Sequence, residues 1–273
     1  MIIDGHAHSG GAFSTVENIV SILNTCKVDK VVLCPPQVHG TNDQKLPGLA
    51  KWFPHADVML PLNKIIRLVT TTVKPTEPLS TRNEALYRLV TQNPERLIQF
   101  YWIDPQETEA LHTLQETHRT WRFKGVKAHQ CSEVFHADSP TMHHIAEFCH
   151  EHHLPFFIHL FSKHEIRQCI QLVQQHPHTN FIVGHLIGLE IFTQCHAPFP
   201  HVYFDISPPS LISTPRIMKA VTVFGADHVL LGSDTPYGMN NLQKNVERIH
   251  HLDISQESKA CILGENMQRL LGL

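Results

Sequence analysis

Histidine and aspartate residues end several short apolar segments of this 273-residue chain. The first such segment runs Asp4-Gly-His6-Ala-His8, directly after an apolar start. Because side chains alternate faces along a strand, His6 and His8 should point the same way, about 7 Å apart along the backbone. Two imidazoles at that spacing can converge on one metal ion. The motif alone is weak in a chain with 23 histidines, so other segments have to support it.

Three further apolar segments end in residues that can bind a metal. Segment 155–159 ends in His159, segment 180–185 ends in His185, and segment 229–234 ends in Asp234. Separate structural roles could explain each of these residues singly. Separate roles do not readily explain why four strands all end in residues that can bind a metal ion. This pattern indicates one polar site at which the ends of several strands meet.

A lysine and a histidine follow each other closely in segment 123–129. Val126 and Ala128 should face outward against helices, which turns Lys127 and His129 toward the interior. There Lys127 could bind a substrate carboxylate, or be carboxylated and bridge two metal ions. The alternative is a lysine that only extends its amine to the rim of the fold.

The elements that must position these residues alternate between strand and helix patterns. The expected strands are 1–4, 30–34, 97–101, 123–128, 155–159, 180–184, 202–205 and 229–233. The expected helices include 16–25, 107–120, 141–152, 165–175, 215–224, 242–251 and a last helix from an N-cap at Ser255 to Leu271. Eight such units predict a (β/α)8 TIM barrel. An open doubly wound sheet is the second choice, because no Gly-x-Gly-x-x-Gly follows the first strand.

One long segment interrupts this alternation. Residues 35–80 contain seven prolines and are too long for an ordinary connection between a strand and a helix. The segment leaves the carboxyl end of the second strand, so we expect it over the mouth of the barrel. It could be a substrate lid or a contact through which two copies form a homodimer. We predict a single domain, residues 1–273, that carries this insertion.

The composition excludes several classes of partner. The formal net charge is −3 and the acids and bases are mixed, so no basic stripe predicts nucleic acid or a membrane surface. No segment is long and apolar enough to span a membrane, and the amino terminus lacks the pattern of a signal peptide. Seven cysteines without a Cys-x-x-Cys motif predict free thiols. We therefore expect a cytoplasmic protein with a small-molecule substrate.

The sequence resembles the amidohydrolase superfamily, in particular its amidohydrolase-related branch, which includes aminocarboxymuconate-semialdehyde-type decarboxylases. The matching stretches span nearly the whole chain and are IIDGHAH, GVKAH, LPFFIH, FIVGH, VYFDIS, VLLGSDTPYG and GENMQRLLG. The resemblance implies that His6, His8, His159 and Asp234 bind the metal and that His185 polarises the substrate or transfers protons. The related TatD-like nucleases have a glutamate on the fourth strand, where this chain has Lys127 and His129, and this difference argues against a nuclease.

The implied activity is that of a metal-dependent hydrolase. Three imidazoles and one carboxylate suit Zn²⁺ best, and also Mn²⁺, Fe²⁺, Co²⁺ or Ni²⁺. We expect one ion, or two if Lys127 is carboxylated. Asp234 would accept a proton from the metal-activated water, and His185 would stabilise the oxyanion. Lys127 and His129 would hold an anionic group of a small amide, lactone or ester.

Two other functions are also compatible with the sequence. A decarboxylase of a small unsaturated or aromatic acid would use the same metal ligands. A non-catalytic metal-binding protein would also explain many histidines, but it does not require them at the ends of strands. The sequence does not identify the acidic partner of His185. Asp205 also ends a strand, but capping of the turn that follows explains it equally well.

Overall fold

The computed structural model describes residues 1–37, 46–73, 76–195 and 197–273. Its strands are parallel and follow the order of the chain in two sheets, one of three strands and one of six. They are β1 Ile3–His8, β2 Lys30–Cys34, β3 Leu97–Gln99, β4 Tyr101–Trp102, β5 Val126–His129, β6 Phe156–His159, β7 Phe181–Val183, β8 Val202–Asp205 and β9 Val229–Leu230. The expected strand 97–101 is present in two pieces, because Phe100 donates its backbone N–H to β2 and Tyr101 donates to the segment before β5.

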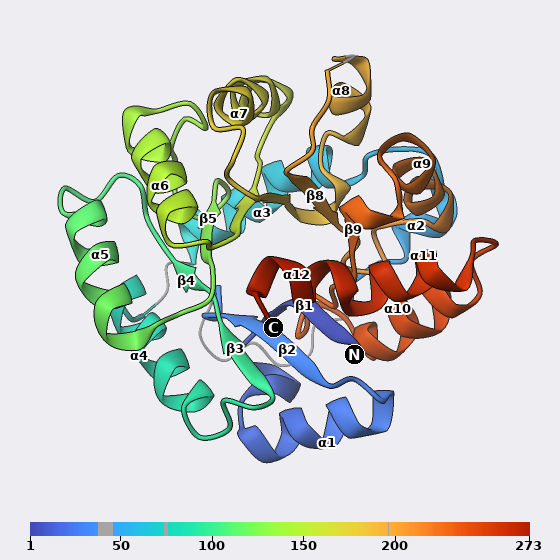
Figure 1. Cartoon of the computed structure of the whole chain (residues 1–273), viewed down its shortest axis with the longest axis horizontal. Coiled ribbons are helices and arrows are strands. Elements are labelled where there is room, and N and C mark those ends of the chain that lie inside the picture. The colour runs from blue at the N-terminus through green and yellow to red at the C-terminus, as the bar shows by residue number, and fades with distance from the viewer. Residues whose placement is uncertain (38–45, 74–75, 196) are drawn as a thin grey trace.

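Backbone hydrogen bonds join the last strand to the first. Gly5 donates to Leu231 at 2.8 Å, and His8 donates to Thr235 at 2.7 Å. In the other direction Asp234 donates to the carbonyl of His6 at 2.8 Å. These bonds complete the ring of parallel strands, and the chain has the predicted TIM-barrel fold (Figure 1).

Helices surround the ring and follow the strands in sequence. They are α1 Val16–Cys26, α2 Leu49–Trp52, α3 Met59–Thr72, α4 Leu79–Val90, α5 Ala110–Trp121, α6 Pro140–Glu151, α7 Lys163–Gln175, α8 Leu189–Gln194, α9 Thr214–Phe224, α10 Asn241–His250, α11 Gln256–Ala260 and α12 Asn266–Leu271. The side chains of Thr15, Ser162 and Ser213 accept the N-terminal N–H groups of α1, α7 and α9. Ser255 caps α11 as predicted, but a π-helical turn at Cys261–Glu265 divides the expected last helix. None of the described helices has the length and apolar character needed to cross a membrane.

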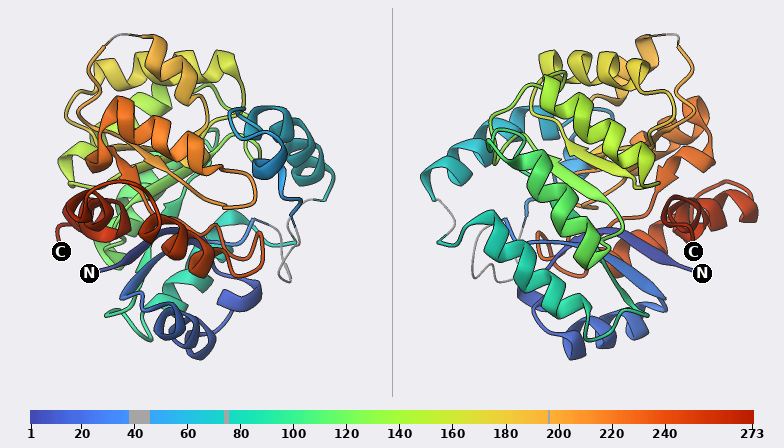
Figure 2. Two further views of the ribbon diagram at one scale, coloured as in Figure 1. Left: turned by 90° about the vertical axis from the view of Figure 1, so that its right-hand side faces the viewer. Right: turned by 60° about the vertical axis from the view of Figure 1, so that its left-hand side comes forward.

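The barrel is filled by large apolar side chains and closed at one end by α12. Phe100, Trp102 and Phe157 are buried inside the ring, and Met267 of α12 packs among them. The termini and α12 lie at this end, whereas α2 and α3 lie at the opposite end (Figure 2). The carboxyl ends of the strands are at the end covered by α3, and the polar side chains of the barrel gather there.

The insertion at 35–80 contains three helical pieces, because α2 and α3 lie within it and α4 begins at its end. Residues 38–45 and 74–75 of the insertion lie outside the described residues. Helix α3 is attached to the barrel by Thr70, which donates to the carbonyl of Cys131 at 2.6 Å, and by Arg67, which donates to that of Gln130 at 2.6 Å. The dimer contact expected of this segment stays a prediction.

Candidate active site

The structure brings together His6 and His8 of β1 and Asp234, which follows β9. One ligand atom of each lies within 4.8 Å of the others, and all three residues are buried. The Nε2 atoms of His6 and His8 lie 3.8 Å and 3.6 Å from Oδ1 of Asp234. An extra residue in β1 relative to β2, between Asp4 and Ala7, sets the direction of both imidazoles. Two imidazoles and a carboxylate can hold a divalent metal ion.

Hydrogen bonds on the far side of each ring orient these histidines. Nδ1 of His8 donates to the carbonyl of Pro35 at 2.7 Å, and Nδ1 of His6 lies 3.2 Å from Oδ2 of Asp205. Both acceptors place the ring proton on Nδ1, so both Nε2 atoms carry a lone pair. Such partners fix the tautomer of histidines that bind metals. The two lone pairs point to the same location.

The amine of Lys127 occupies the location that the two lone pairs share. Its Nζ lies 2.9 Å from Nε2 of His6 and 3.0 Å from Nε2 of His8. Val126 and Ala128 pack outward in the core and Lys127 is 1% exposed, as the alternation along β5 predicted. The imidazoles of His6 and His8 and the carboxylate of Asp234 fit a divalent metal ion. The ammonium group of Lys127 would compete with such an ion for the Nε2 lone pairs of the two histidines.

His185 shares an acidic partner with His6, and sequence analysis did not identify it. Nδ1 of His185 donates to the carbonyl of Ser207 at 2.8 Å and lies 3.5 Å from Oδ2 of Asp205. The same Oδ2 accepts the backbone N–H of His185 at 3.1 Å. Asp205 thus connects a predicted metal ligand to the predicted catalytic histidine. Its position at the end of β8 was the one signal in the sequence.

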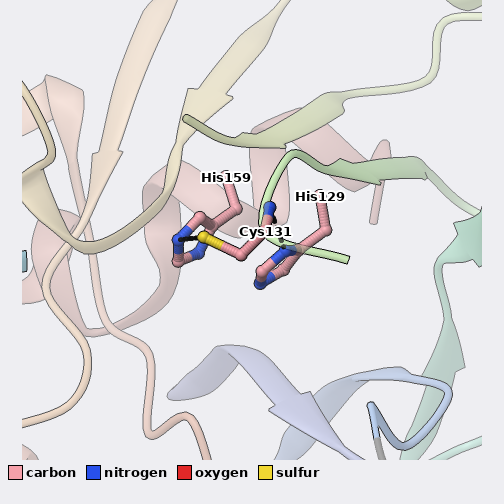
Figure 3. A group of neighbouring side chains, drawn as sticks. All are labelled: His129, Cys131 and His159. Carbon is pink, nitrogen blue, oxygen red and sulfur yellow. Dashed lines mark hydrogen bonds between the residues drawn. The ribbon is translucent and has the colours of Figure 1, made fainter. Parts of the chain in front are cut away.

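His159 lies in a neighbouring group with His129 and Cys131 (Figure 3). The imidazoles of His129 and His159 are stacked with centroids 3.9 Å apart and planes inclined by 18°. The backbone N–H of Cys131 donates to Nδ1 of His129 at 3.2 Å, so the neutral ring carries its proton on Nε2. Parallel rings cannot both direct lone pairs at one ion, and His129 is therefore better suited to donate a hydrogen bond.

A cavity of about 230 Å³ opens above these groups. Lys127, His129, His159, His185 and Asp234 line its polar end. The insertion supplies most of the opposite wall, which is apolar: Leu46, Met59, Leu62, Ile65, Ile66 and Val69, with Leu211 from the barrel. The cavity therefore fits a small molecule with a polar end and an apolar body.

Two of the site residues have backbone conformations that are unusual for non-glycine residues. Asp234 has φ 54° and His185 has φ 60°, both in the left-handed region. Each is held there by its backbone N–H, which donates to His6 or to Asp205 respectively. Such conformations persist only where the surroundings enforce them, and they are concentrated at functional sites.

Burial controls the charges of the site in the metal-free protein. It lowers the pKa of the imidazoles of His6, His8 and His159 well below the ordinary 6.5, so these rings are neutral. Burial also raises the pKa of Asp234 well above its ordinary 3.8, and the positive charge of Lys127 opposes this shift. Neutral imidazoles are the form that binds metal ions.

Gly232 is expected to be essential for this arrangement. A Cβ at this position would lie 2.0 Å from Oδ1 of Asp205 and 3.1 Å from Cβ of His6. We predict that Gly232→Ala displaces Asp205, frees His6 to rotate and weakens metal binding by about tenfold or more. Titration with a chromophoric chelator measures the affinity. Gly48→Ala is the control, because a Cβ there has no described atom within 4 Å; equal affinities in both variants would contradict the prediction.

Glu133 gives the metal-free protein a distinct pH dependence. Burial raises the pKa of this carboxyl from 4.5 to about 8, although its hydrogen bond from Nε1 of Trp102 at 3.0 Å lowers it. Because the pKa is higher in the folded protein than in the unfolded chain, protonation of Glu133 adds to the free energy of unfolding. This stabilisation is complete below about pH 4.5 and is lost as the pH rises through 8. Glu133→Gln should therefore raise Tm at pH 8.5 relative to wild type by at least about 2 °C. Calorimetry at pH 5 and 8.5 checks this, with the exposed Glu151→Gln as the control.

Comparison with known proteins identifies the family of this chain. The family model described as Amidohydrolase matches residues 63–273, which is more than half of the chain. The chain therefore belongs to the amidohydrolase family. Comparison with curated proteins gives no match.

Solved structures of low sequence identity share the fold. An uncharacterized TIM-barrel protein from Bordetella bronchiseptica has a TM-score of 0.72 and 13% identity, over 99% of this chain and 98% of that chain. 2,6-Dihydroxybenzoate decarboxylase from Rhizobium has a TM-score of 0.66 and 14% identity, over 99% and 98%. A probable 2-pyrone-4,6-dicarboxylic acid hydrolase from Acinetobacter baumannii, with citric acid bound, has a TM-score of 0.66 and 15% identity, over 100% and 99%. At 13–15% identity these similarities show the shared fold alone.

Proposed function

We propose that this chain is a metal-dependent hydrolase of a small carboxylated amide, lactone or ester. The observation that carries the proposal is the convergence of two Nε2 lone pairs, from His6 and His8, beside the carboxylate of Asp234. The carboxylate of Asp205 and the carbonyl of Pro35 lie next to the Nδ1 atoms of the two rings and direct both Nε2 lone pairs to the same location. The site lies at the carboxyl ends of the strands, where TIM-barrel enzymes have their active sites.

His6, His8 and Asp234 would hold the ion, with His159 as the fourth ligand. Zinc is our first choice, and Mn²⁺, Fe²⁺, Co²⁺ or Ni²⁺ also suit this mixture of nitrogen and oxygen donors. We propose one ion, and a second only if Lys127 is carboxylated. When bound, such an ion supplies a Lewis acid and makes water more acidic.

The chain's own groups would move the protons. Asp234 has a carboxylate at the polar end of the cavity and would accept a proton from the attacking water, then return it to the leaving group. In neutral His185 the proton is on Nδ1, so the ring donates from Nε2 only after it gains a second proton. Burial lowers the pKa of His185, and the carboxylate of Asp205, 3.5 Å away, opposes this shift. A proton that the ring gained during the reaction would let His185 stabilise the oxyanion.

Lys127 and His129 would bind the carboxylate of the substrate. Lys127 brings a positive charge to the polar end of the cavity, and the neutral ring of His129 offers its Nε2 proton. The apolar wall formed by α3 would hold the remainder of the molecule. A small acid with one apolar portion satisfies both ends.

A decarboxylase of a small aromatic or unsaturated acid is the second candidate. The apolar wall of the cavity favours it, because it fits the ring of an aromatic acid. The structural similarity to 2,6-dihydroxybenzoate decarboxylase supports the same possibility. Both reactions would use the same metal ligands.

The test combines metal analysis with product analysis on protein without a histidine tag. We expect about one ion per wild-type chain and much less in His159→Ala and Asp234→Ala. Carboxylated lactones, amides, esters and aromatic acids are then screened for acid or alcohol release and for CO₂ release in parallel. CO₂ release without hydrolysis would establish the second candidate, and metal contents equal to wild type in both variants would contradict the ligand set.

A further inference from the structure

Asn63 of α3 reaches from the insertion into the polar end of the barrel. It is completely buried, and its Nδ2 donates to the carbonyls of Leu160 at 2.8 Å and Phe161 at 3.0 Å. Two carbonyl acceptors occupy both protons of the amide, so its orientation is determined. Oδ1 must therefore face the other way, and it lies 2.9 Å from Nε2 of His159.

This contact determines where the proton of His159 resides. An amide oxygen only accepts hydrogen bonds, so the neutral imidazole carries its proton on Nε2. Sγ of Cys131 also lies 3.6 Å from this nitrogen and can accept as well, because its own proton is directed to the backbone carbonyl of Asn63 at 3.8 Å. Nδ1 then carries the lone pair, and it is buried without a hydrogen-bond partner among the described residues. A buried polar atom without a partner is costly and calls for an explanation. A bound metal ion would supply the missing partner.

We infer that Asn63 is a positioning residue that holds His159 in the Nε2–H tautomer and thereby commits Nδ1 to the metal ion. The inference rests on the proposed function for the ion itself, but the tautomer is a property of the metal-free protein. It also gives the insertion a direct part in the active site, because Asn63 belongs to α3, whose neighbouring face forms the apolar wall of the cavity.

Two variants of Asn63 separate positioning from simple attachment of α3. Asn63→Leu removes both the donors to Leu160 and Phe161 and the acceptor for His159. Asn63→Asp also loses both donors but keeps an oxygen next to Nε2 of His159. If Asn63 only attaches the helix, the two variants should weaken metal binding equally. If it positions the ring, the leucine variant should lose about tenfold to a hundredfold in Zn²⁺ affinity, and the aspartate variant much less.

A matched control is Asn266→Leu at the opposite end of the barrel. Asn266 is equally buried, donates to the carbonyls of Ala226 and Val229 at 2.8 Å each, and accepts a hydrogen bond from Arg269. Its replacement removes a similar set of bonds far from His159. Zn²⁺ affinity should then remain at the wild-type value even where Tm falls.

The deciding experiment is the nitrogen-15 NMR spectrum of the imidazoles in metal-free protein, with His159→Gln to assign the signal. We expect a protonated Nε2 and a bare Nδ1 on His159 in wild type, in Asn63→Asp and in Asn266→Leu, and a mixture of tautomers in Asn63→Leu. A proton on Nδ1 in wild type would overturn the inference, even if no variant of Asn63 folds. If wild-type protein binds no Zn²⁺, the proposed function is wrong. The tautomer seen in the NMR spectrum of the metal-free protein would still show whether Asn63 positions His159.

Discussion

Asp234→Asn is expected to lower kcat by about a thousandfold and to weaken metal binding, because one carboxylate serves both purposes. The amide cannot accept a proton from water, and it removes a negative charge that lies 3.6 Å from Nε2 of His8. Asparagine has the same shape, and the backbone bond from residue 234 to the carbonyl of His6 does not involve the side chain. The fold should therefore remain.

Metal content and turnover on the substrate found by the screen measure these two effects separately. At saturating Zn²⁺ the variant should recover its metal but not its rate, because proton transfer is still missing. Asp253→Asn, at an exposed aspartate, is the control. Recovery of full activity by added metal would show that Asp234 is only a ligand, and the proton acceptor would then have to be another group.

Lys127→Met is expected to lower kcat/KM for a carboxylated substrate by about a hundredfold while metal binding is retained or becomes tighter. The variant loses the positive charge at the polar end of the cavity. It also releases the Nε2 atoms of His6 and His8, which Nζ contacts at 2.9 Å and 3.0 Å. Methionine fills a similar volume, so the packing inside the barrel should persist.

Metal analysis of this variant also decides how Lys127 acts. Two ions in wild type and one or none in Lys127→Met would identify a carboxylated, bridging lysine in place of a substrate-binding ammonium. Lys124→Met is the matched control, because Lys124 is exposed just before the same strand. An uncharged analogue of the substrate should be turned over equally by wild type and by Lys127→Met if the ammonium binds the carboxylate.

The residues at the strand ends could be predicted from the sequence, because apolar segments mark the strands and side chains alternate between the two faces of a strand. Strands β2 and β8 have the expected bounds, and His6, His8 and Asp234 meet because parallel strands of a barrel end at one face. The alternation of Val126, Lys127 and Ala128 similarly predicts which side chain faces inward. Periodicity and strand ends thus give the fold and the centre of the site.

Contacts between distant segments could not be predicted in the same way. Asn63 lies 96 positions from His159, in a proline-rich insertion whose path no periodic pattern determines. The role of Asp205 depends on a side-chain contact between the ends of β8 and β1, two strands that are far apart in the sequence and are not neighbours in the sheet. The grouping of His159 with His129 and Cys131 depends likewise on the stacking of two rings from neighbouring strands.

In the proposed enzyme, one side of helix α3 would contact the apolar part of the substrate, and the adjacent side attaches the helix to the barrel. Asn63, Arg67 and Thr70 attach one face of the helix to the barrel, whereas Leu62, Ile66 and Val69 form part of the cavity wall, which Thr70 also reaches at its edge. Each set recurs at intervals of three or four residues, which places the two sets on adjacent sides of one helix. Mutations on the cavity side can therefore accumulate without moving any strand-end residue. If the proposed function holds, evolution could change the apolar part of the substrate through substitutions in this one helix, while the residues at the strand ends stay the same.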